Sequence, residues 1–232
     1  MEVLINFRSY PVQRTLEILL QDRSTGKNII WATDPPGELE NCTDRQPITL
    51  EQLRETEYRI IQPRMMKDNS EQQERTKKKG EVFTPAWICC LMNDYLDSQW
   101  FKRKSRLPSK VNGQSWENLH EPIFFPKGRR WQSYVDSRRL EICCGEAPFL
   151  ASRYDSATGE MLPISRRIGL LDRKLRVVNE NTEDEKEWLN WAKRAIQSTY
   201  GYEYQGDNLL LARINMLLTF QEYYEARWER IS

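Results

Sequence analysis

The sequence has few of the residues on which common catalytic and metal sites depend. His120 is the only histidine in 232 residues and precedes Pro122 in a polar stretch, which argues against a His-based triad or a His-rich metal site. The five cysteines include two adjacent pairs and form no C-x-x-C, and adjacent cysteines have poor geometry for a disulfide or a chelate. No P-loop is present. The cysteine spacing favours buried thiols in a reducing compartment.

The chain also lacks long apolar runs and an excess of charge of either sign. No apolar stretch approaches the roughly 20 residues of a membrane span, and no basic stretch followed by an apolar one opens the sequence. We therefore expect no membrane association and a cytoplasmic location. The 35 basic residues are balanced by 34 acidic ones, so any basic surface has to be local. The 8 Trp, 10 Tyr and 7 Phe residues argue against general disorder and for a globular core.

Hydrophobic spacing predicts helices that alternate with short strands, and therefore an α/β fold. We expect helices over 9–20, 49–57, 164–178 and 182–196, from Thr84 onward, and over the last 25 residues, and strands at 28–32, 58–61, 138–144 and 198–204. Thr49 with Gln52, and Thr182 with Glu185, have capping-box spacing. The helix from Thr84 has one apolar face, the pattern of a helix packed on a core; this face carries Trp87, Leu91, Tyr95 and Leu96.

Residues 67–79 contain no apolar side chain and divide the chain. We predict an N-terminal α/β region over 1–66, a polar linker or lid over 67–79, and a second domain over 80–232. The three lysines at 77–79 would also suit a phosphate backbone. Two more basic stretches, 102–110 and 128–139, have a composition that fits nucleic-acid contact, although solvated loops are the simpler interpretation.

The strand at 138–144 has an alternating pattern that predicts burial, and the turn after it carries the strongest functional signal. A strand, a turn of small residues and a helix let backbone amides approach a nucleotide-like ligand. Here the sequence is LEICCGEAPFL, which contains Glu141, Cys144, Gly145, Pro148 and Phe149. This stretch resembles motif I of the gamma-class N6-adenine DNA methyltransferases, which in that family wraps the methionine and ribose of S-adenosylmethionine.

Two flanking motifs are similar to motifs of the same family and occur in the same order. Phe83-Thr84-Pro85 resembles the family's first motif, whose Thr-Pro turn lies beside the methionine end of the cofactor. Glu203 resembles the acidic residue that binds the ribose hydroxyls, a role that suits a carboxylate because it accepts two hydrogen bonds. The resemblance covers residues 80–215 and is closest to modification subunits of restriction systems. It implies a partial Rossmann-like S-adenosylmethionine-dependent methyltransferase fold, followed by a long C-terminal helix.

The sequence departs from the family's pattern in the turn and lacks its catalytic motif. Ala147 replaces the second expected glycine, and Glu146 adds a charge. The family's Asn/Asp-Pro-Pro-aromatic motif, which holds the flipped adenine, is not found after Asn215. Asp34 begins a similar stretch, DPPG, but this has glycine in place of the aromatic and is better explained as a turn after a strand. We therefore assign no catalytic residue.

Three functions remain open. The resemblance implies an S-adenosylmethionine-binding DNA adenine methyltransferase-like protein of a restriction–modification or phage-related system, incomplete on its own, with DNA and a second protein chain as partners. The alternative is a catalytically inactive relative that binds nucleic acid or a protein, for example a phage or mobile-element anti-defence factor. The third is a small-molecule or RNA methyltransferase that uses the same cofactor site, and no residue favours it.

Overall fold

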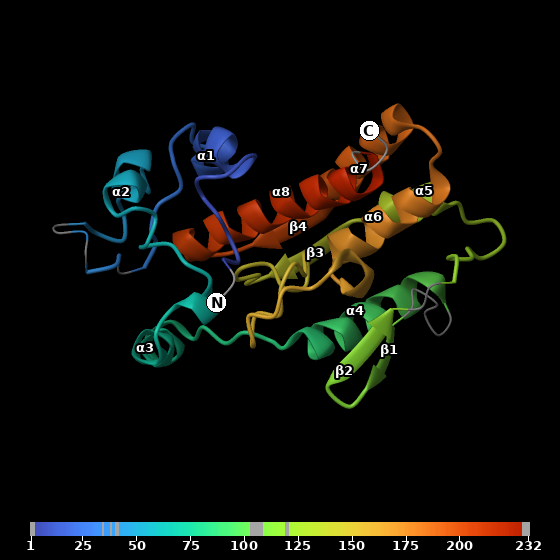
Figure 1. The fold of residues 1–232 in the computed structure, drawn as a ribbon, viewed down its shortest axis with the longest axis horizontal. Coiled ribbons are helices and arrows are strands. Elements are labelled where there is room, and N and C mark those ends of the chain that lie inside the picture. The colour runs from blue at the N-terminus through green and yellow to red at the C-terminus, as the bar shows by residue number, and fades with distance from the viewer. Residues whose placement is uncertain are drawn as a thin grey trace.

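The computed structural model describes residues 3–33, 35–37, 39, 42–102, 109–118 and 121–228. The described residues form eight α-helices and two sheets of two strands each (Figure 1), which confirms the predicted mixture of α and β structure. Asp34 and His120 lie outside the described residues, as do positions 103–108 of the basic stretch 102–110.

The N-terminal region contains two of the expected helices but neither expected strand. Helix α1 spans Val12–Leu20 and α2 spans Leu50–Glu55, which begins at the predicted capping box of Thr49 and Gln52. Residues 28–32 form only isolated bridges, and 58–61 form a turn, because Glu57 and Tyr58 have positive φ angles that no strand accommodates. Ile29, Trp31, Ile60 and Ile61 of these segments are buried in a core that includes Leu210, Leu211 and Ile214 of the C-terminal part, whereas Ile30 is exposed.

The stretch predicted as a polar linker contains helix α3, Asn69–Lys79. The Asp68 side chain accepts a hydrogen bond from the Glu71 amide, and Gly80, in the left-handed region, ends the helix. Arg75 is buried and forms ion pairs of 2.6 Å with Glu81 and 2.8 Å with Asp207. The stretch is therefore helical although it has no apolar residues, because the buried ion pairs of Arg75 hold α3 against Glu81 and Asp207. The division of the chain into domains remains a prediction.

Helix α4, Ala86–Phe101, begins directly after Pro85, as the sequence predicts, but a different face is buried. Leu91, Tyr95 and Leu96 are exposed, so the predicted packing face is wrong for these residues. The buried face includes Asn93 and Asp97, which are fully enclosed and hydrogen-bonded to other parts of the chain, although the Asn93 Oδ1 atom has no partner among the described residues. Asn93, for example, donates to the carbonyls of residues 149 and 168.

An antiparallel hairpin and a short helix follow, and neither was predicted as such. Strand β1, Ser109–Asn112, pairs with β2, Ser115–Asn118, and helix α5 spans Trp131–Val135. Tyr134 is buried, and the half-buried ring of Trp131 packs edge-on against Trp191. Tyr134 is therefore a core residue, and Trp131 packs against the same core.

The remaining elements surround a parallel pair of strands. Strand β3, Arg139–Ile142, pairs with β4, Thr199–Tyr202, with Glu141 opposite Gly201. Helices α6, Leu170–Asn181, and α7, Glu185–Gln197, connect the two strands, and α8, Gly206–Trp228, follows β4. The N-cap of α7 is Asp184 rather than the predicted Thr182. Figure 1 shows this sheet at the centre of the molecule, with α1–α3 at one end and α5–α7 at the other.

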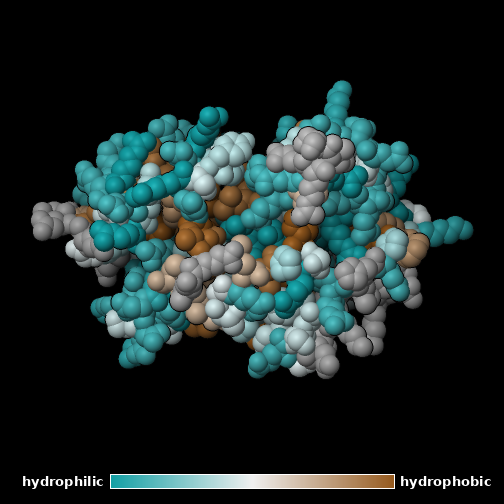
Figure 2. Space-filling view, in the orientation of Figure 1, coloured by the Kyte–Doolittle hydropathy of each residue, from teal (hydrophilic) through white to brown (hydrophobic). Residues whose placement is uncertain are grey.

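One face of the parallel sheet is uncovered. Leu140 and Ile142 are 52% and 72% exposed, and their register partners Tyr200 and Tyr202 are exposed on the same face. The predicted burial of β3 is therefore wrong for this face, whereas on the opposite face Gly201 closely approaches Leu150. Figure 2 shows hydrophobic side chains near the middle of a hydrophilic surface, in the region where Figure 1 places these strands. Parallel sheets are normally covered on both faces, so the described residues leave this sheet incomplete.

Candidate cofactor-binding site

A cavity of about 490 Å³ opens at the carboxyl ends of β3 and β4. Its lining comes from four parts of the chain: Thr33, the end of α3 with residues 80–84, the end of β3 with the turn that follows it (141–149), and residues 203–208 after β4. All sequence-predicted site residues except Pro85 line it, and Pro85 lies next to it as the N-cap of α4. The lining residues among them are Phe83, Thr84, Glu141, Cys144, Gly145, Pro148, Phe149 and Glu203.

The turn after β3 follows a tight path made of left-handed residues. Cys143, Gly145 and Ala147 have φ angles of 59°, 53° and 69°. A Cβ on Gly145 would lie 3.3 Å from the Phe83 ring, so the absence of a side chain there lets the turn pack against the residues before α4. Ala147 adopts the backbone conformation that favours the glycine expected at this position. This conformation costs an alanine about 1 kcal/mol.

Glu146 does not place its charge in the cavity. It is 2% exposed, and its carboxylate accepts hydrogen bonds from the Arg64 amide at 2.5 Å and the Tyr154 hydroxyl at 2.6 Å. Asn215 of α8 donates to the Glu146 carbonyl and to the same Tyr154 hydroxyl. Burial raises the pKa of Glu146 to about 7, although both hydrogen bonds oppose that shift. Glu146 therefore connects the turn to the N-terminal region through its side chain and to α8 through its carbonyl.

Glu203 connects the end of β4 to the turn. One carboxylate oxygen accepts from the Gly145 amide at 2.7 Å, and the other accepts from the Gln205 amide at 2.9 Å. Because each carboxylate oxygen can accept more than one hydrogen bond, both retain capacity for ligand hydroxyls. The position and the remaining acceptors of Glu203 are those required of a residue that binds a ribose.

Glu141 is the second carboxyl group in the cavity. Burial and, to a lesser degree, the negative charge of Glu203 raise its pKa to about 8. Its Oε2 atom is buried and has no hydrogen-bond partner among the described residues. Glu141 in turn contributes, after burial, to raising the pKa of the Cys89 and Cys144 thiols, so these cysteines are protonated and unreactive at neutral pH.

A buried network of charges holds the segment that precedes Phe83. Glu81 pairs with Arg75 and accepts from Asn208 at 3.2 Å, and Arg64 donates to the Glu81 carbonyl at 2.9 Å. Sequence reasoning missed the roles of Glu81, Arg75 and Arg64. The only local signal is the polarity of the stretch, and long-range ion pairs leave no periodic pattern by which to recognise them.

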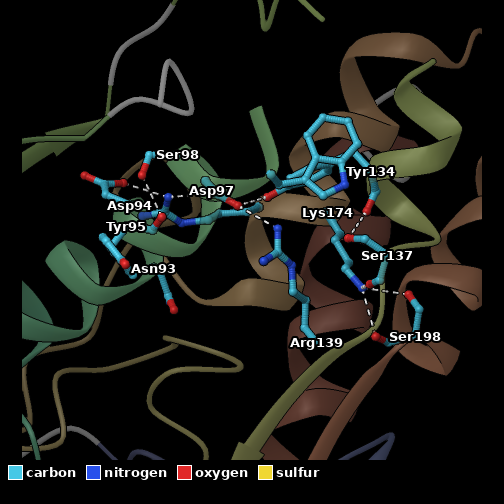
Figure 3. A network of polar contacts seen from close by, with 12 residues as sticks. Asn93, Asp94, Tyr95, Asp97, Ser98, Tyr134, Ser137, Arg139, Lys174 and Ser198 are labelled. Atoms are coloured by element: carbon cyan, nitrogen blue, oxygen red, sulfur yellow. Dashed lines mark hydrogen bonds and ion pairs between the residues drawn. The ribbon is translucent and has the colours of Figure 1, made fainter. Parts of the chain in front are cut away.

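A second buried network holds the opposite ends of the two strands (Figure 3). Lys174 of α6 donates to the carbonyls of Ser137 and Ser198, which precede β3 and β4, at 2.7 and 3.0 Å. Arg139 at the start of β3 pairs with Asp97 of α4 at 3.2 Å. Burial lowers the pKa of Lys174 to about 7. The starts of both strands are therefore fixed, and the cavity lies at the ends where the backbone turns away.

The family models, the curated proteins and the solved structures contain no match to this chain. Within the described part of the chain, no three His, Cys, Asp or Glu residues group in a way that could hold a metal ion. Nor does any described helix have the length and apolarity needed to cross a membrane.

Proposed function

We propose that the cavity binds S-adenosylmethionine and that the chain is part of a DNA adenine methyltransferase-like protein of a restriction–modification or phage-related system. The observation that supports this is convergence: three motifs, at 83–85, 141–149 and 203, meet around one cavity at the carboxyl ends of parallel strands. Ligands of open α/β sheets bind at this edge. The cavity volume of about 490 Å³ lies in the range of small-molecule sites, and the rings of Phe83 and Phe149 offer apolar contact.

We further propose that a second polypeptide supplies or replaces the catalytic half and, with this chain, contacts DNA. Two observations support a missing protein part. No described strand pairs with the outer edge of β3, and the face with Leu140 and Ile142 is exposed. An open strand edge and an apolar face are both satisfied by added polypeptide. The alternative, an inactive relative that acts by binding nucleic acid or a protein, has the same cavity and the same open sheet.

Calorimetric titration with S-adenosylmethionine tests the cofactor proposal. We expect binding to the wild type and at least roughly tenfold weaker binding to Glu203→Ala, because hydrogen bonds to a charged acceptor contribute about 1.5–3 kcal/mol each. Glu203→Gln keeps an acceptor and is expected to lie between the two. The matched control is Glu57→Ala, which removes an exposed carboxylate outside the cavity.

Glu203 also accepts a hydrogen bond from the Gly145 amide, so its replacement could loosen the turn. Thermal unfolding of each variant separates this effect from the loss of ligand contacts. No binding to the wild type at millimolar cofactor would overturn the proposal. A methyl-transfer assay on DNA addresses the second chain: we expect no activity from this chain alone, and turnover by it would show that no catalytic partner is needed.

A further inference from the structure

An open hollow of about 630 Å³ lies at the end of α4 that is remote from the cofactor cavity. Its lining comes from Gln99 and Trp100 at the end of α4 and from residues 128–133 at the start of α5. Figure 1 places the end of α4 and α5 on the same side of the molecule, away from α3. Because α4 has 16 residues and begins beside the cofactor cavity, roughly 20 Å separate the two sites. The proposed cofactor site therefore does not account for this hollow.

The guanidinium of Arg129 is held in place in the hollow by Trp100. Its central carbon lies 4.7 Å from the centroid of the Trp100 ring, and its Nη1 donates to the Trp100 carbonyl. These two contacts fix the side chain before any ligand arrives, which reduces the entropy lost on binding. An arginine has five N–H donors, and the bond to Trp100 is the one found for Arg129 among the described residues. The hollow thus contains an oriented cation with donors left for a ligand.

The hollow is cationic. Arg129 and Arg130 line it, and its other described lining residues are uncharged. Lys102 and Lys127 belong to the segments that border it and are exposed. In the described part of the chain none of these four cations forms an ion pair, and Asp136 at the end of α5 is paired with an arginine of α7. A group of cations without counter-charges suits a polyanion.

The shape and chemistry of the hollow favour a phosphodiester backbone. A guanidinium presents its donors in a planar fork that matches the oxygens of a phosphate. Gly128 has a φ of 83°, and no described atom lies within 4 Å of an added Cβ, so the turn before Arg129 leaves room for a bulky chain. Arg129 covers a face of the Trp100 ring, which argues against stacking of a base there. Contacts to phosphate alone carry no sequence information.

We propose that this hollow binds the phosphate backbone of duplex DNA through Arg129 and Arg130, independently of base sequence. The choice of DNA as the polyanion rests on the proposed function, whereas the position of the site does not. The lysines at 78 and 79 are a weaker candidate, because they border the cofactor cavity and have polar partners of their own. This chain thus contacts DNA at a distance from the place where the cofactor is bound.

Fluorescence anisotropy with a short labelled DNA duplex tests the inference. We expect Arg129→Ala and Arg130→Ala each to weaken binding roughly tenfold, because each removes charge-assisted hydrogen bonds to phosphate. The slope of log affinity against log salt concentration should decrease by about one for each variant. The matched control is Arg23→Ala, which removes an exposed arginine in the turn after α1 and should bind as wild type. Two duplexes of unrelated sequence should bind equally well.

Arg129→Lys separates charge from geometry, since lysine keeps the charge but not the planar fork. We expect it to bind DNA more weakly than wild type with an unchanged salt slope. Arg130 is exposed, so Arg130→Ala decides the matter even if replacement of Arg129 disturbs folding.

Three outcomes would overturn the inference: no binding of wild type to DNA at low salt, an equal loss in the control and in both hollow variants, or competition by a polyglutamate peptide as strong as that by unlabelled DNA. Calorimetry with S-adenosylmethionine keeps this failure distinct from failure of the proposed function. Arg129→Ala and Arg130→Ala should retain wild-type affinity for the cofactor, because the hollow is remote from its cavity. Absence of cofactor binding to wild type would overturn the proposed cofactor site and not the DNA contact.

Discussion

Gly145 illustrates, at the scale of a single residue, how the turn and the segment before α4 depend on each other. Its φ is positive, and an added Cβ would lie 3.3 Å from Phe83. We expect Gly145→Ala to lower the free energy of unfolding by about 1–2 kcal/mol, from backbone strain and displacement of the Phe83 ring. Because Phe83 lines the cavity, affinity for S-adenosylmethionine should fall as well. Denaturant unfolding and calorimetry measure the two effects.

Gly128→Ala is the matched control, since Gly128 also has a positive φ but no atom near the added Cβ. It should show the strain alone and leave ligand affinity unchanged. Equal stability losses in the two variants, with unchanged affinity in both, would contradict the proposed contact between the turn and Phe83.

Motif residues such as Phe83, Glu141 and Glu203 could be predicted from the sequence because each lies close to the end of a strand or the start of a helix, and these boundaries have local signals. The direction in which the Glu146 side chain points could not be predicted from the sequence. Its side chain points away from the cavity because it accepts hydrogen bonds from Arg64 and Tyr154, and no sequence pattern links either residue to the turn. The sequence therefore predicts residues that meet around one cavity, but not the inward or outward direction of each side chain.

At the scale of elements, buried charge decides how α4 packs. Periodicity favoured its apolar face, yet Asp97 lies on the buried face because it accepts from the Tyr134 hydroxyl at 2.8 Å and pairs with Arg173 at 2.8 Å and Arg139 at 3.2 Å. An apolar pattern cannot reveal a carboxylate that three elements satisfy together. The same holds for α3, whose attachment depends on Arg75 rather than on apolar residues.

Asp97→Ala tests this packing. Removal of one member of a buried ion-pair network leaves Arg173 poorly compensated, since Asp94 is its only other carboxylate partner among the described residues. We expect a loss of about 3–5 kcal/mol in the free energy of unfolding. Asp136→Ala, which removes a surface pair with Arg194, should cost less than about 1 kcal/mol in the same denaturation experiment. A similar cost for both variants would show that the buried network does not determine how α4 packs.

At the scale of the whole molecule, the sequence predicts the order of most helices and both parallel strands but not the environment of the sheet. The pattern of β3 indicated burial because isoleucine and leucine alternate with polar residues in it. In the structure Leu140 and Ile142 are exposed, and they line an open cavity together with residues of α4 such as Leu91 and Tyr95. The alternating pattern of β3 is typical of a strand whose apolar face is buried, but the described residues leave that face exposed.

This mismatch leads to a prediction about the isolated chain. Ile142→Lys alters a side chain that is 72% exposed and should change the free energy of unfolding by no more than about 0.5 kcal/mol. Leu150→Ala alters a fully buried side chain on the covered side of the same sheet and should cost about 2–5 kcal/mol. Ile142→Lys should also reduce binding of a hydrophobic dye and any concentration-dependent association in sedimentation equilibrium, because it interrupts the exposed apolar patch. If Ile142→Lys destabilised the chain as much as Leu150→Ala, the face would already be covered in the isolated protein, and the argument for a missing polypeptide at this sheet would fail.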